Sequence, residues 1–243
     1  MENNNLKIKG KNILISGGTT GIGRATAKLL VNYGANVMIF GRDKNHLDDA
    51  IFDIENKNGK IFGVTADVSD KNQVKEVFKK FEETYGDIDV LINNASLPAR
   101  SILDCQSNKW QYIVNVNILG YLYCSSEAVN RMIKGNGGHL INIGSLSSVL
   151  REEGADIYVA TKSAVEGFSD SLRKQIGKYE IKVSLIEPGS VGTNLITHNS
   201  KEQEILQKES KMLKAEDVAE AILFCLTRPK RCDIIELKIR PHK

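Results

Sequence analysis

The chain is poor in cysteine, and its four cysteines form neither a metal-binding nor a disulfide pattern. Cys105, Cys124, Cys225 and Cys232 contain no CxxC pair, and no histidine stands at ligand spacing from them. This pattern disfavours zinc and a disulfide framework, so we expect no metal site. The four thiols are expected to be packing residues.

Long apolar runs and a charge excess are also missing. No unbroken apolar stretch approaches the ~18 residues that span a bilayer, and the opening MENNN has neither the basic nor the apolar region of a signal peptide. With 33 basic and 30 acidic residues the net charge is only +3, and no Lys/Arg cluster alternates with aromatics. We therefore expect a soluble, cytoplasmic protein that binds neither nucleic acid nor membrane.

No Pro/Gly/Ser-rich linker divides the 243 residues, of which 41% are hydrophobic and 26% charged, as in folded globular domains. Short apolar runs alternate with segments of helical period along the chain, which predicts βα units. We expect a single α/β domain over residues 1–243, a doubly wound Rossmann-type fold with a mostly parallel seven-stranded sheet. The predicted strands are 12–16, 36–40, 60–65, 89–93, 139–144, 182–187 and 233–239, and the predicted helices are 21–33, 44–57, 71–85, 110–134, 158–178 and 215–226.

A glycine-rich turn, SGGTTGIG at 16–23, joins the first predicted strand to the first predicted helix. A strand, a turn of glycines and a helix N-terminus together make a phosphate site. Gly17 would permit the tight turn, Gly21 the close approach of backbone to a pyrophosphate, and Gly23 the close packing of helix on strand. Glycines in a βα turn also occur without a ligand, so the motif alone leaves a plain turn open.

The spacing of this turn resembles TGxxxGxG, the fingerprint of the short-chain dehydrogenase/reductase family, with Ser16 in place of threonine. Further matches run from about residue 10 to about residue 194. Asp67-Val68 stands at the family's adenine-contacting position, NNAS (93–96) matches NNAG with Ser96 replacing glycine, and PGSVGT (188–193) matches PGxVxT. The resemblance implies these cofactor-binding residues: Gly17, Thr19, Thr20, Gly21, Ile22, Arg42, Asp67, Val68, Asn94, Tyr158, Lys162, Val191 and Thr193.

The end of the second predicted strand bears on which cofactor binds. An acidic residue about 20 positions beyond the glycines would bind the ribose 2′-hydroxyl of NAD, whereas an arginine would neutralise a 2′-phosphate. Here Gly41 stands at the acidic position and Arg42 follows. In the family that this chain resembles, such a pair accompanies NADP, so we expect NADP(H) as cofactor. The other interpretation is a solvated surface arginine beside Asp43, itself a possible helix N-cap.

Tyr158 and Lys162 form a YxxxK pattern, which places both on one face of a predicted helix. Such pairs are common without function, so they need support from other residues. Ser145 follows a predicted strand end 13 residues before Tyr158, the separation of the catalytic serine and tyrosine in the resembled family. Ser147 and Ser148 are nearby competitors for this place.

Asn117, in NILG at 117–120, matches the family's NxxG, with Asn115 as its rival. The resemblance thus implies a catalytic set of Asn117, Ser145, Tyr158 and Lys162. Hydride transfer to a ketone or aldehyde leaves charge on the carbonyl oxygen, which Tyr158 would protonate. The Lys162 ammonium would favour the phenolate and lower a tyrosine pKa of about 10. The resemblance further implies that Lys162 binds ribose hydroxyls, Ser145 binds the substrate oxygen, and Asn117 holds a water.

The ending DIIELKIRP, at 233–241, lacks the Gly-Gly pair that closes many family members. It is similar to NADP-dependent 3-hydroxy acid dehydrogenases and broad carbonyl reductases. The expected activity is therefore reversible reduction of a ketone or aldehyde, as a 3-hydroxy acid or general carbonyl reductase. The alternatives are a 3-oxoacyl-[acyl-carrier-protein] reductase and, without catalysis, an NADP-binding sensor or scaffold.

Specificity is expected in loops near residues 97–106, 146–157 and 195–213, the last an irregular insert of weak helical character that we interpret as a substrate lid. Glu152 and Glu153 are expected in a solvated loop, with the substrate mouth as the second interpretation. The family usually pairs the helices that carry Asn117 and Tyr158, so a homodimer or homotetramer is expected. Nearby aromatic side chains belong either to the core or to that interface: Trp110, Tyr112, Tyr121 and Tyr123.

Overall fold

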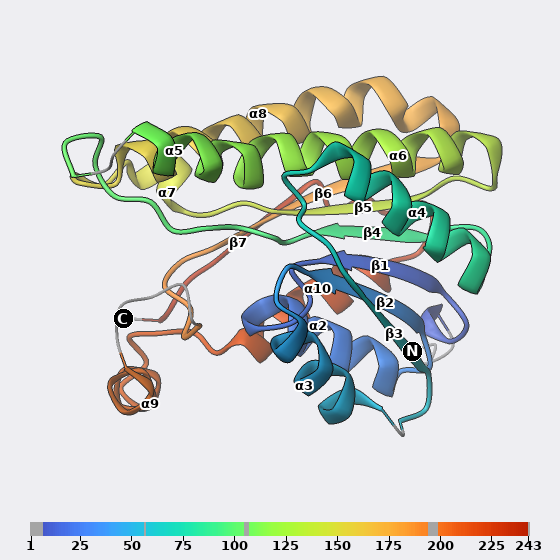
Figure 1. Ribbon diagram of the computed structural model, residues 1–243, viewed down its shortest axis with the longest axis horizontal. Helices are drawn as coiled ribbons and strands as arrows, with labels where there is room; N and C mark the ends of the chain where they lie inside the picture. Colours follow the sequence, from blue (N-terminus) through green and yellow to red (C-terminus); the bar gives the residue numbers. More distant parts are fainter. Residues whose placement is uncertain (1–6, 56, 105–106, 194–198, 243) are drawn as a thin grey trace.

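The protein, seen in a computed structural model that describes residues 7–55, 57–104, 107–193 and 199–242, is built on one parallel sheet of seven strands (Figure 1). The strands lie in the order β3-β2-β1-β4-β5-β6-β7, and every neighbouring pair is parallel. They are β1 (Asn12–Ser16), β2 (Asn36–Gly41), β3 (Lys60–Thr65), β4 (Val90–Asn93), β5 (Gly138–Ile143), β6 (Ile181–Pro188) and β7 (Glu236–Ile239). The predicted doubly wound α/β fold is confirmed.

Helices cover both faces of the sheet (Figure 1). One face carries α2 (Gly21–Asn32), α3 (Lys44–Ile54) and α10 (Ala215–Leu226). The other carries α4 (Lys71–Tyr85), α6 (Gly120–Lys134) and α8 (Asp156–Ile176). Shorter segments complete the fold: α5 (Ser107–Val114), the π-helical turn η1 (Asn115–Leu119), α7 (Ser147–Leu150), the 3-10 turn η2 (Gly177–Tyr179) and α9 (Ser200–Lys208).

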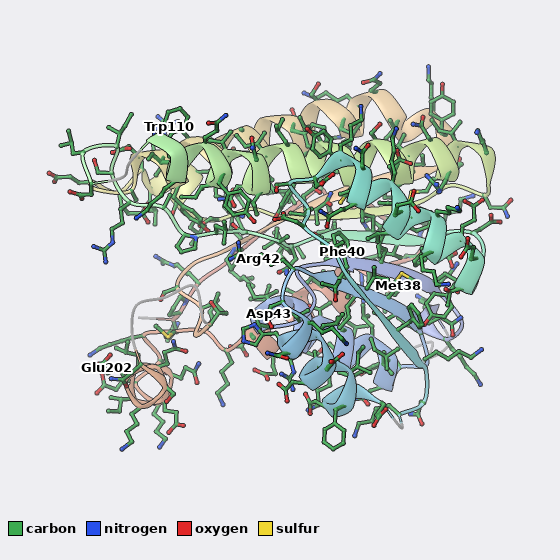
Figure 2. The ribbon with its side chains drawn as sticks, in the orientation of Figure 1. Met38, Phe40, Arg42, Asp43, Trp110 and Glu202 are labelled. Atoms are coloured by element: carbon green, nitrogen blue, oxygen red, sulfur yellow. The ribbon has the colours of Figure 1, made fainter. Side chains whose placement is uncertain are left out.

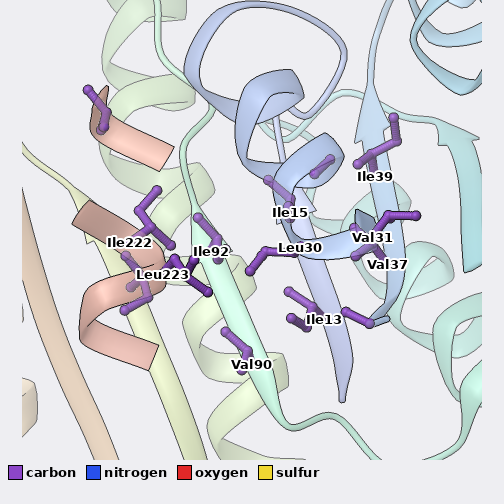
Figure 3. Packing of buried hydrophobic residues seen from close by; sticks show 14 of the residues in the cluster. Ile13, Ile15, Leu30, Val31, Val37, Ile39, Val90, Ile92, Ile222 and Leu223 are labelled. Carbon is purple, nitrogen blue, oxygen red and sulfur yellow. The ribbon is translucent and has the colours of Figure 1, made fainter. Parts of the chain in front are cut away.

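Two hydrophobic clusters hold these layers, one on each face of the sheet. Side chains alternate along a strand, so Ile13 and Ile15 pack toward α2 and α10, whereas Leu14 packs toward α4 and α6. Figure 3 shows the first cluster, in which Leu30 of α2 and Ile222 of α10 lie over the central strands. All five of these side chains are fully buried. A chain with apolar residues at consecutive strand positions therefore needs a helical layer on each side.

The helix predicted over residues 110–134 differs from the structure in its start and in its regularity. It begins at Ser107, and η1 interrupts the α-helical pattern between α5 and α6. In this turn the backbone N–H of Gly120 donates to the carbonyl of Asn115, five residues back. Gly120 packs so closely on the next layer that an added Cβ would lie 2.8 Å from a Val68 methyl. The extra residue of a π-turn leaves no mark on a 3.6-residue hydrophobic period, so sequence reasoning missed it.

The last strand and the insert before α10 also depart from the expectations. Strand β7 begins at Glu236 and not at residue 233. Before Glu236 the backbone makes only single hydrogen bonds to β6: the Ile234 carbonyl accepts from the Ser184 hydroxyl, and the Ile235 carbonyl accepts from the Leu185 N–H. Within 195–213, the predicted irregular insert, residues 200–208 form the regular helix α9, which Asn199 caps. Residues 195–198 of this predicted lid lie outside the described residues.

Three cysteines are free thiols: Cys124 and Cys225 are buried in the core, and Cys232 is half-buried. Cys105 lies outside the described residues. Among the helices of the described ranges, none combines the length and the apolar character that crossing a membrane requires. The same part of the chain brings no three His, Cys, Asp or Glu side chains together as ligands for a metal ion.

Candidate active site

The glycine turn after β1 opens a cradle at the carboxyl edge of the sheet. Gly17 and Gly21 adopt φ angles of +64° and +52°, in the left-handed region that favours glycine. Helix α2 begins directly after the extended N-cap Thr20, whose side chain does not cap it. The first backbone N–H groups of α2 therefore face the turn without a side-chain acceptor, as in a phosphate site.

Hydrogen bonds between β1 and the end of β4 hold this turn in shape. The buried Ser16 hydroxyl accepts from the backbone N–H groups of Asn94 and Ala95 at 3.0 and 3.2 Å. The Asn94 amide in turn donates to the carbonyls of Ser16 and Gly17 at 3.1 and 2.9 Å. A Cβ on Gly23 would lie 2.3 Å from the Gly17 carbonyl oxygen, so only glycine allows α2 to pack this closely. The hydroxyl at position 16 thus holds the turn in shape, and serine supplies that hydroxyl.

A pocket of about 280 Å³, the glycine-turn pocket, lies over this cradle. It brings together most of the predicted cofactor residues: Gly17, Thr19, Thr20, Gly21, Ile22, Arg42, Asp67, Val68, Asn94 and Thr193. They come from the ends of β1, β2, β3 and β4 and from the segment after β6, regions far apart in the sequence. The switch point between β1 and β4, where the strand order reverses, is where open α/β sheets bind dinucleotides.

Arg42 reaches into this pocket from the end of β2, between the two helical layers (Figure 2). Its Nη1 donates to the Tyr112 hydroxyl at 2.9 Å, and that hydroxyl donates to the Asp67 carboxylate at 2.5 Å. Asp43 caps α3 by accepting from the His46 N–H. At Gly41, where NAD-binding sheets carry an acid, an added Cβ would lie 2.9 Å from a Thr19 methyl.

Tyr112 is a pocket residue that sequence reasoning did not place. The sequence predicts a core or interface aromatic at Tyr112, and α5 packs this ring against the edge of a hydrophobic cluster and on the wall of the glycine-turn pocket. Tyr121 is the core aromatic of the group, 1% exposed, and Trp110 is only half-buried and lies away from Arg42 (Figure 2). No motif or spacing marks Tyr112, because its position depends on where α5 crosses the ends of β2 and β3.

A second pocket of about 490 Å³, the Tyr158 pocket, adjoins the first and shares Ile22, Asn94, Ser96 and Thr193 with it. It lies beyond the carboxyl ends of β5 and β6. Three residues of the predicted catalytic set line it, namely Ser145, Tyr158 and Lys162, and the predicted cofactor residue Val191 lines it as well. The 13-residue separation of Ser145 and Tyr158 in the chain thus becomes proximity in one pocket.

Lys162 forms the floor of the Tyr158 pocket and is 1% exposed. Its Nζ donates to the Ile143 carbonyl at 2.9 Å and lies 5.7 Å from the ring centroid of Tyr158. Tyr121 donates to the same carbonyl at 3.0 Å. Burial lowers the pKa of Lys162 from 10.5 to about 7, because the desolvated ammonium ion is disfavoured.

The Tyr158 phenol is under opposing influences. Burial is the largest and raises its pKa, and the carboxylate of Glu152 raises it further. The hydroxyls of Ser145 and Ser96 act the other way and lower the pKa by favouring the phenolate. The net direction is upward, so near neutral pH the phenol holds its proton. The lowering by Lys162 that the sequence suggested is not among these influences.

Ser96, which replaces the glycine of the family motif, is accommodated without closing the turn. It lines both pockets, and its hydroxyl oxygen is buried and makes no full hydrogen bond within the described residues. The oxygen is nevertheless close enough to the Tyr158 phenol to lower its pKa. The substitution therefore adds a second hydroxyl beside the phenol.

The geometry distinguishes Ser145 from its two neighbours. The Ser145 hydroxyl faces Tyr158 and accepts from the Ser147 N–H at 3.2 Å. Ser148 instead donates to the fully buried Glu187 carboxylate at 2.7 Å. Ser147 also lines the pocket, and its hydroxyl donates to Glu152 at 3.3 Å. Of the three serines, Ser145 is the one beside the phenol.

Asn117 lies on η1 and is fully buried, whereas Asn115 is only half-buried. The Asn117 side chain accepts from the Leu97 N–H at 2.7 Å and donates to the Leu97 carbonyl at 2.9 Å. It also lies 3.2 Å from the Thr161 hydroxyl. The amide of Asn117 thus joins the loop after β4 to α8, and it lines neither pocket.

The segment after β6 connects the pockets to the insert. Val191 pairs with Leu213 in an isolated parallel bridge, which brings the two ends of the insert together. From α9, Gln203 donates to the Thr193 carbonyl at 3.1 Å. Helix α9 lies apart from the layers (Figure 1), joined to the pockets through Thr193. The predicted lid is therefore tethered at the rim shared by both pockets.

The walls of the Tyr158 pocket are mainly apolar, with Pro98, Ala99, Leu146 and Leu150 among them. Glu152 also lines this pocket, whereas Glu153 does not. Both carboxylates are exposed. Among the described lining residues, Glu152 and Lys162 are the only charged side chains, and Lys162 lies buried beneath Tyr158.

A larger hollow of about 950 Å³ lies at the opposite edge of the sheet, near the amino ends of the strands. Several of its charged side chains pair with one another, as Lys11 with Asp89 at 2.6 Å and Lys230 with Glu180 at 2.9 Å. Open α/β sheets bind ligands at the carboxyl ends of their strands, so size alone does not make this hollow the site.

A doubly wound sheet with a glycine cradle at its switch point and a tyrosine–lysine pair beside it defines a dinucleotide-dependent class of α/β protein. Comparison with known proteins agrees. A family model described as short chain dehydrogenase matches residues 11–204. An uncharacterized oxidoreductase of Staphylococcus aureus (strain MRSA252) is 36% identical over 230 residues, 94% of this chain and 96% of the relative. Another from Staphylococcus saprophyticus is 31% identical over 238 residues, 97% and 99% of the two chains.

Among solved structures, a short-chain type dehydrogenase/reductase from Mycobacterium ulcerans superposes with a TM-score of 0.87 at 24% identity. The match covers 96% of this chain and 89% of the other, and it confirms the fold. The chain belongs to the short-chain dehydrogenase/reductase family, whose members are oxidoreductases that use NAD(H) or NADP(H).

Proposed function

We propose that the protein is an NADPH-dependent reductase that converts a ketone or aldehyde to an alcohol and, in reverse, oxidises the alcohol. The observation that carries this proposal is the Tyr158 pocket, where Ser145, Tyr158 and Lys162 meet beside the glycine cradle. A dinucleotide bound across the two pockets would supply the hydride. The residues of this chain supply the proton and the orientation of the carbonyl.

Tyr158 acts as the acid of the reduction. Because its pKa is raised by burial, the phenol carries the proton that the developing alkoxide needs at neutral pH. Ser145 donates a hydrogen bond to the same oxygen and so keeps the carbonyl against the phenol. In its cationic form, Lys162, held on the Ile143 carbonyl, would favour the phenolate that remains after the proton has left.

The cofactor fits the residues that are present. Gly17 and Gly21 leave room for a pyrophosphate at the start of α2, and Thr193 lies at the shared rim. Arg42 points its guanidinium into the pocket, and no acidic side chain stands at position 41. An arginine that follows a position without an acid favours a 2′-phosphate, so NADP(H) is preferred over NAD(H). Equal or better kcat/KM with NADH would contradict this preference.

The substrate is a 3-hydroxy acid and its ketone or, more generally, a small carbonyl compound. The chain ending without Gly-Gly supports this choice over a 3-oxoacyl-[acyl-carrier-protein] reductase, which is the alternative. A screen of carbonyl compounds by NADPH absorbance, with a 3-oxoacyl thioester among them, separates the two. Tight NADPH binding without turnover of any carbonyl would instead support a sensor or scaffold.

The experiment that tests the mechanism is Tyr158→Phe. Loss of the phenol proton should abolish reduction while leaving the dissociation constant of NADPH nearly unchanged, because the ring itself stays in place. Steady-state kinetics and fluorescence titration with NADPH measure the two effects. A variant that keeps more than a few per cent of kcat would exclude Tyr158 as the proton donor.

For the assembly we propose a homodimer or homotetramer, because relatives in the family usually pair the helices that carry Asn117 and Tyr158. Light scattering on the purified chain measures the mass and distinguishes these from a monomer.

A further inference from the structure

The phenol of Tyr112 stands between two oppositely charged side chains at the mouth of the glycine-turn pocket. It accepts from Arg42 Nη1 at 2.9 Å and donates to Asp67 Oδ2 at 2.5 Å. The Arg42 guanidinium carbon also lies 5.6 Å from the Tyr112 ring centroid, within range of a cation–π contact. Arg42 directly follows β2, Tyr112 lies on α5 and Asp67 follows β3, so the bridge closes one side of the pocket.

A hydroxyl suits this position. A guanidinium has donors alone and an ionised carboxylate has acceptors alone, whereas a phenol can accept from one and donate to the other. The second oxygen of Asp67 is already occupied, because it accepts from the N–H and the hydroxyl of Ser69 at 2.9 and 2.7 Å. These bonds outweigh burial and hold the pKa of the Asp67 carboxyl below its usual value. Asp67 thus anchors the phenol as a fixed carboxylate.

Without the phenol, Arg42 would have two nearby carboxylates to pair with, Asp67 and Asp43. Both line the same pocket, and the guanidinium acts electrostatically on each of them. Asp43 is engaged in capping α3 and lies 3.8 Å from the His46 ring. Within the described ranges Arg42 forms no ion pair of 4 Å or less with a carboxylate. Its remaining N–H groups are therefore available for an anion.

We propose that Tyr112 is a positioning residue for cofactor selection. By standing between Arg42 and Asp67, it prevents a direct ion pair and keeps the guanidinium turned toward a phosphate monoester on the adenosine ribose. This inference rests on the proposed preference for NADPH and adds the residue that maintains it. The role belongs to Tyr112 itself, because the glycine turn and the YxxxK motif would be the same without it.

Tyr112→Phe tests the proposal, since it removes both hydrogen bonds and keeps the ring. Isothermal titration of the full-length protein with NADPH and with NADH gives the two dissociation constants. We expect the constant for NADPH to rise about 10-fold and that for NADH to change less than about 2-fold, as for loss of a hydrogen bond to a charged group. Tyr123→Phe, on α6 and outside the pocket, is the matched control and should leave both constants unchanged.

A double-mutant cycle with Arg42→Ala separates positioning from a general structural role. In the Arg42→Ala background, Tyr112→Phe should cause no further loss of NADPH affinity, because the group it positions is gone. Two results would overturn the role of Tyr112. One is that Tyr112→Phe leaves the ratio of the NADPH and NADH dissociation constants unchanged, and the other is that it weakens NADPH binding to the full extent in the Arg42→Ala background. A wild-type protein that binds NADH more tightly than NADPH would instead overturn the proposed cofactor preference.

Discussion

The glycine-turn pocket and the Tyr158 pocket lie side by side at one edge of the sheet, yet their polar groups differ in how many hydrogen-bond partners they have. In the first, charged and polar side chains bind one another and the backbone, as Asn94 binds the glycine turn and Tyr112 joins Arg42 to Asp67. In the second, the Nζ of Lys162 is buried with one backbone hydrogen-bond partner, and at the border of the two pockets Ser96 Oγ is buried without a hydrogen bond among the described residues. The glycine-turn pocket is thus internally paired, whereas the Tyr158 pocket holds buried polar groups with few partners.

The difference shows in the direction of the pKa shifts. Hydrogen bonds keep the Asp67 carboxyl ionised in the glycine-turn pocket, whereas burial pushes Tyr158 and Lys162 toward their uncharged forms. Uncharged groups beside a reacting oxygen can give or take a proton near neutral pH. Substitutions at the Tyr158 pocket should therefore change pH profiles and stability, whereas those at the glycine-turn pocket should change cofactor affinity.

The largest expected effect is that of Lys162→Met, which removes the buried amine. Catalysis should fall about 100-fold or more, in the range of a lost proton-transfer group. The fold should nevertheless gain stability at low pH. With a pKa of about 7 in the folded protein against 10.5 unfolded, the unfolded chain binds more protons between these values. The stability of the wild type is therefore lowest below about pH 7 and rises toward pH 10.

Differential scanning calorimetry at pH 6.5 and pH 9.5 checks this sign. The Lys162→Met protein should melt above the wild type at the lower pH, and the gain should shrink at the higher pH as the wild-type lysine loses its proton. Lys174→Met, at an exposed position on the same helix, is the control and should show no such pH dependence. If the gain in melting temperature is the same at both pH values, the charge on Lys162 does not destabilise the folded protein.

An intermediate effect is expected from Glu152→Gln, which neutralises the exposed carboxylate on the wall of the Tyr158 pocket. This carboxylate repels an anionic carbonyl compound, so kcat/KM for a 3-oxo acid should rise about 5-fold in the variant. The methyl ester of the same acid should change little. Removing the charge should also lower the pKa of Tyr158.

Glu153→Gln, at the next residue but outside the pocket, is the matched control for a general change in surface charge. Steady-state kinetics with the acid and the ester at two salt concentrations measures the comparison. If Glu152→Gln and Glu153→Gln change kcat/KM for the acid equally, Glu152 has no influence specific to the pocket.

The smallest effect is expected from Ser96→Ala. The Ser96 hydroxyl lowers the pKa of Tyr158, so its removal should raise that pKa. Alcohol oxidation needs the phenolate, and its rising limb in kcat against pH should move to higher pH. Ketone reduction at neutral pH should be nearly unchanged, because it needs the phenol. A limb that stays in place would mean that Ser96 does not act on Tyr158.

Elements with strong local signals were predicted from the sequence to the residue. Strands β1 and β3 and helices α4 and α10 have the predicted bounds, because periodicity, turns and caps lie within each segment. The π-turn η1 and the late start of β7 were missed, since they depend on Val68 packing against Gly120 and on the partners of β6. For the segment of helix α9 the sequence predicted only weak helical character within an irregular insert, although Asn199 and Glu202 form a capping box there.

The candidate site divides in the same way. Spacing together with the resemblance to the family indicated the glycine turn and the pair of Tyr158 and Lys162, because one helix face or one tight turn brings those residues together. The sequence also left Ser145 open against two neighbouring serines, and contacts to Glu187 and Glu152 separate them in space. Tyr112 carries no motif at all, and its contact with Arg42 spans 70 positions of the chain.

The amino-acid sequence by itself determined the fold class, the cradle of glycines and the placement of Tyr158 and Lys162 on one helix face, since strand and helix periods, a tight turn and an i, i+4 spacing are all local patterns. Only the tertiary structure decided which polar groups meet at the pockets: Arg42 contacts Tyr112, Ser96 lies beside Tyr158, and Glu152 lines the Tyr158 pocket. The physical reason is that hydrogen bonds and desolvation act over a few ångströms in space. The packing of distant strands and helices sets those distances, and no local pattern encodes them.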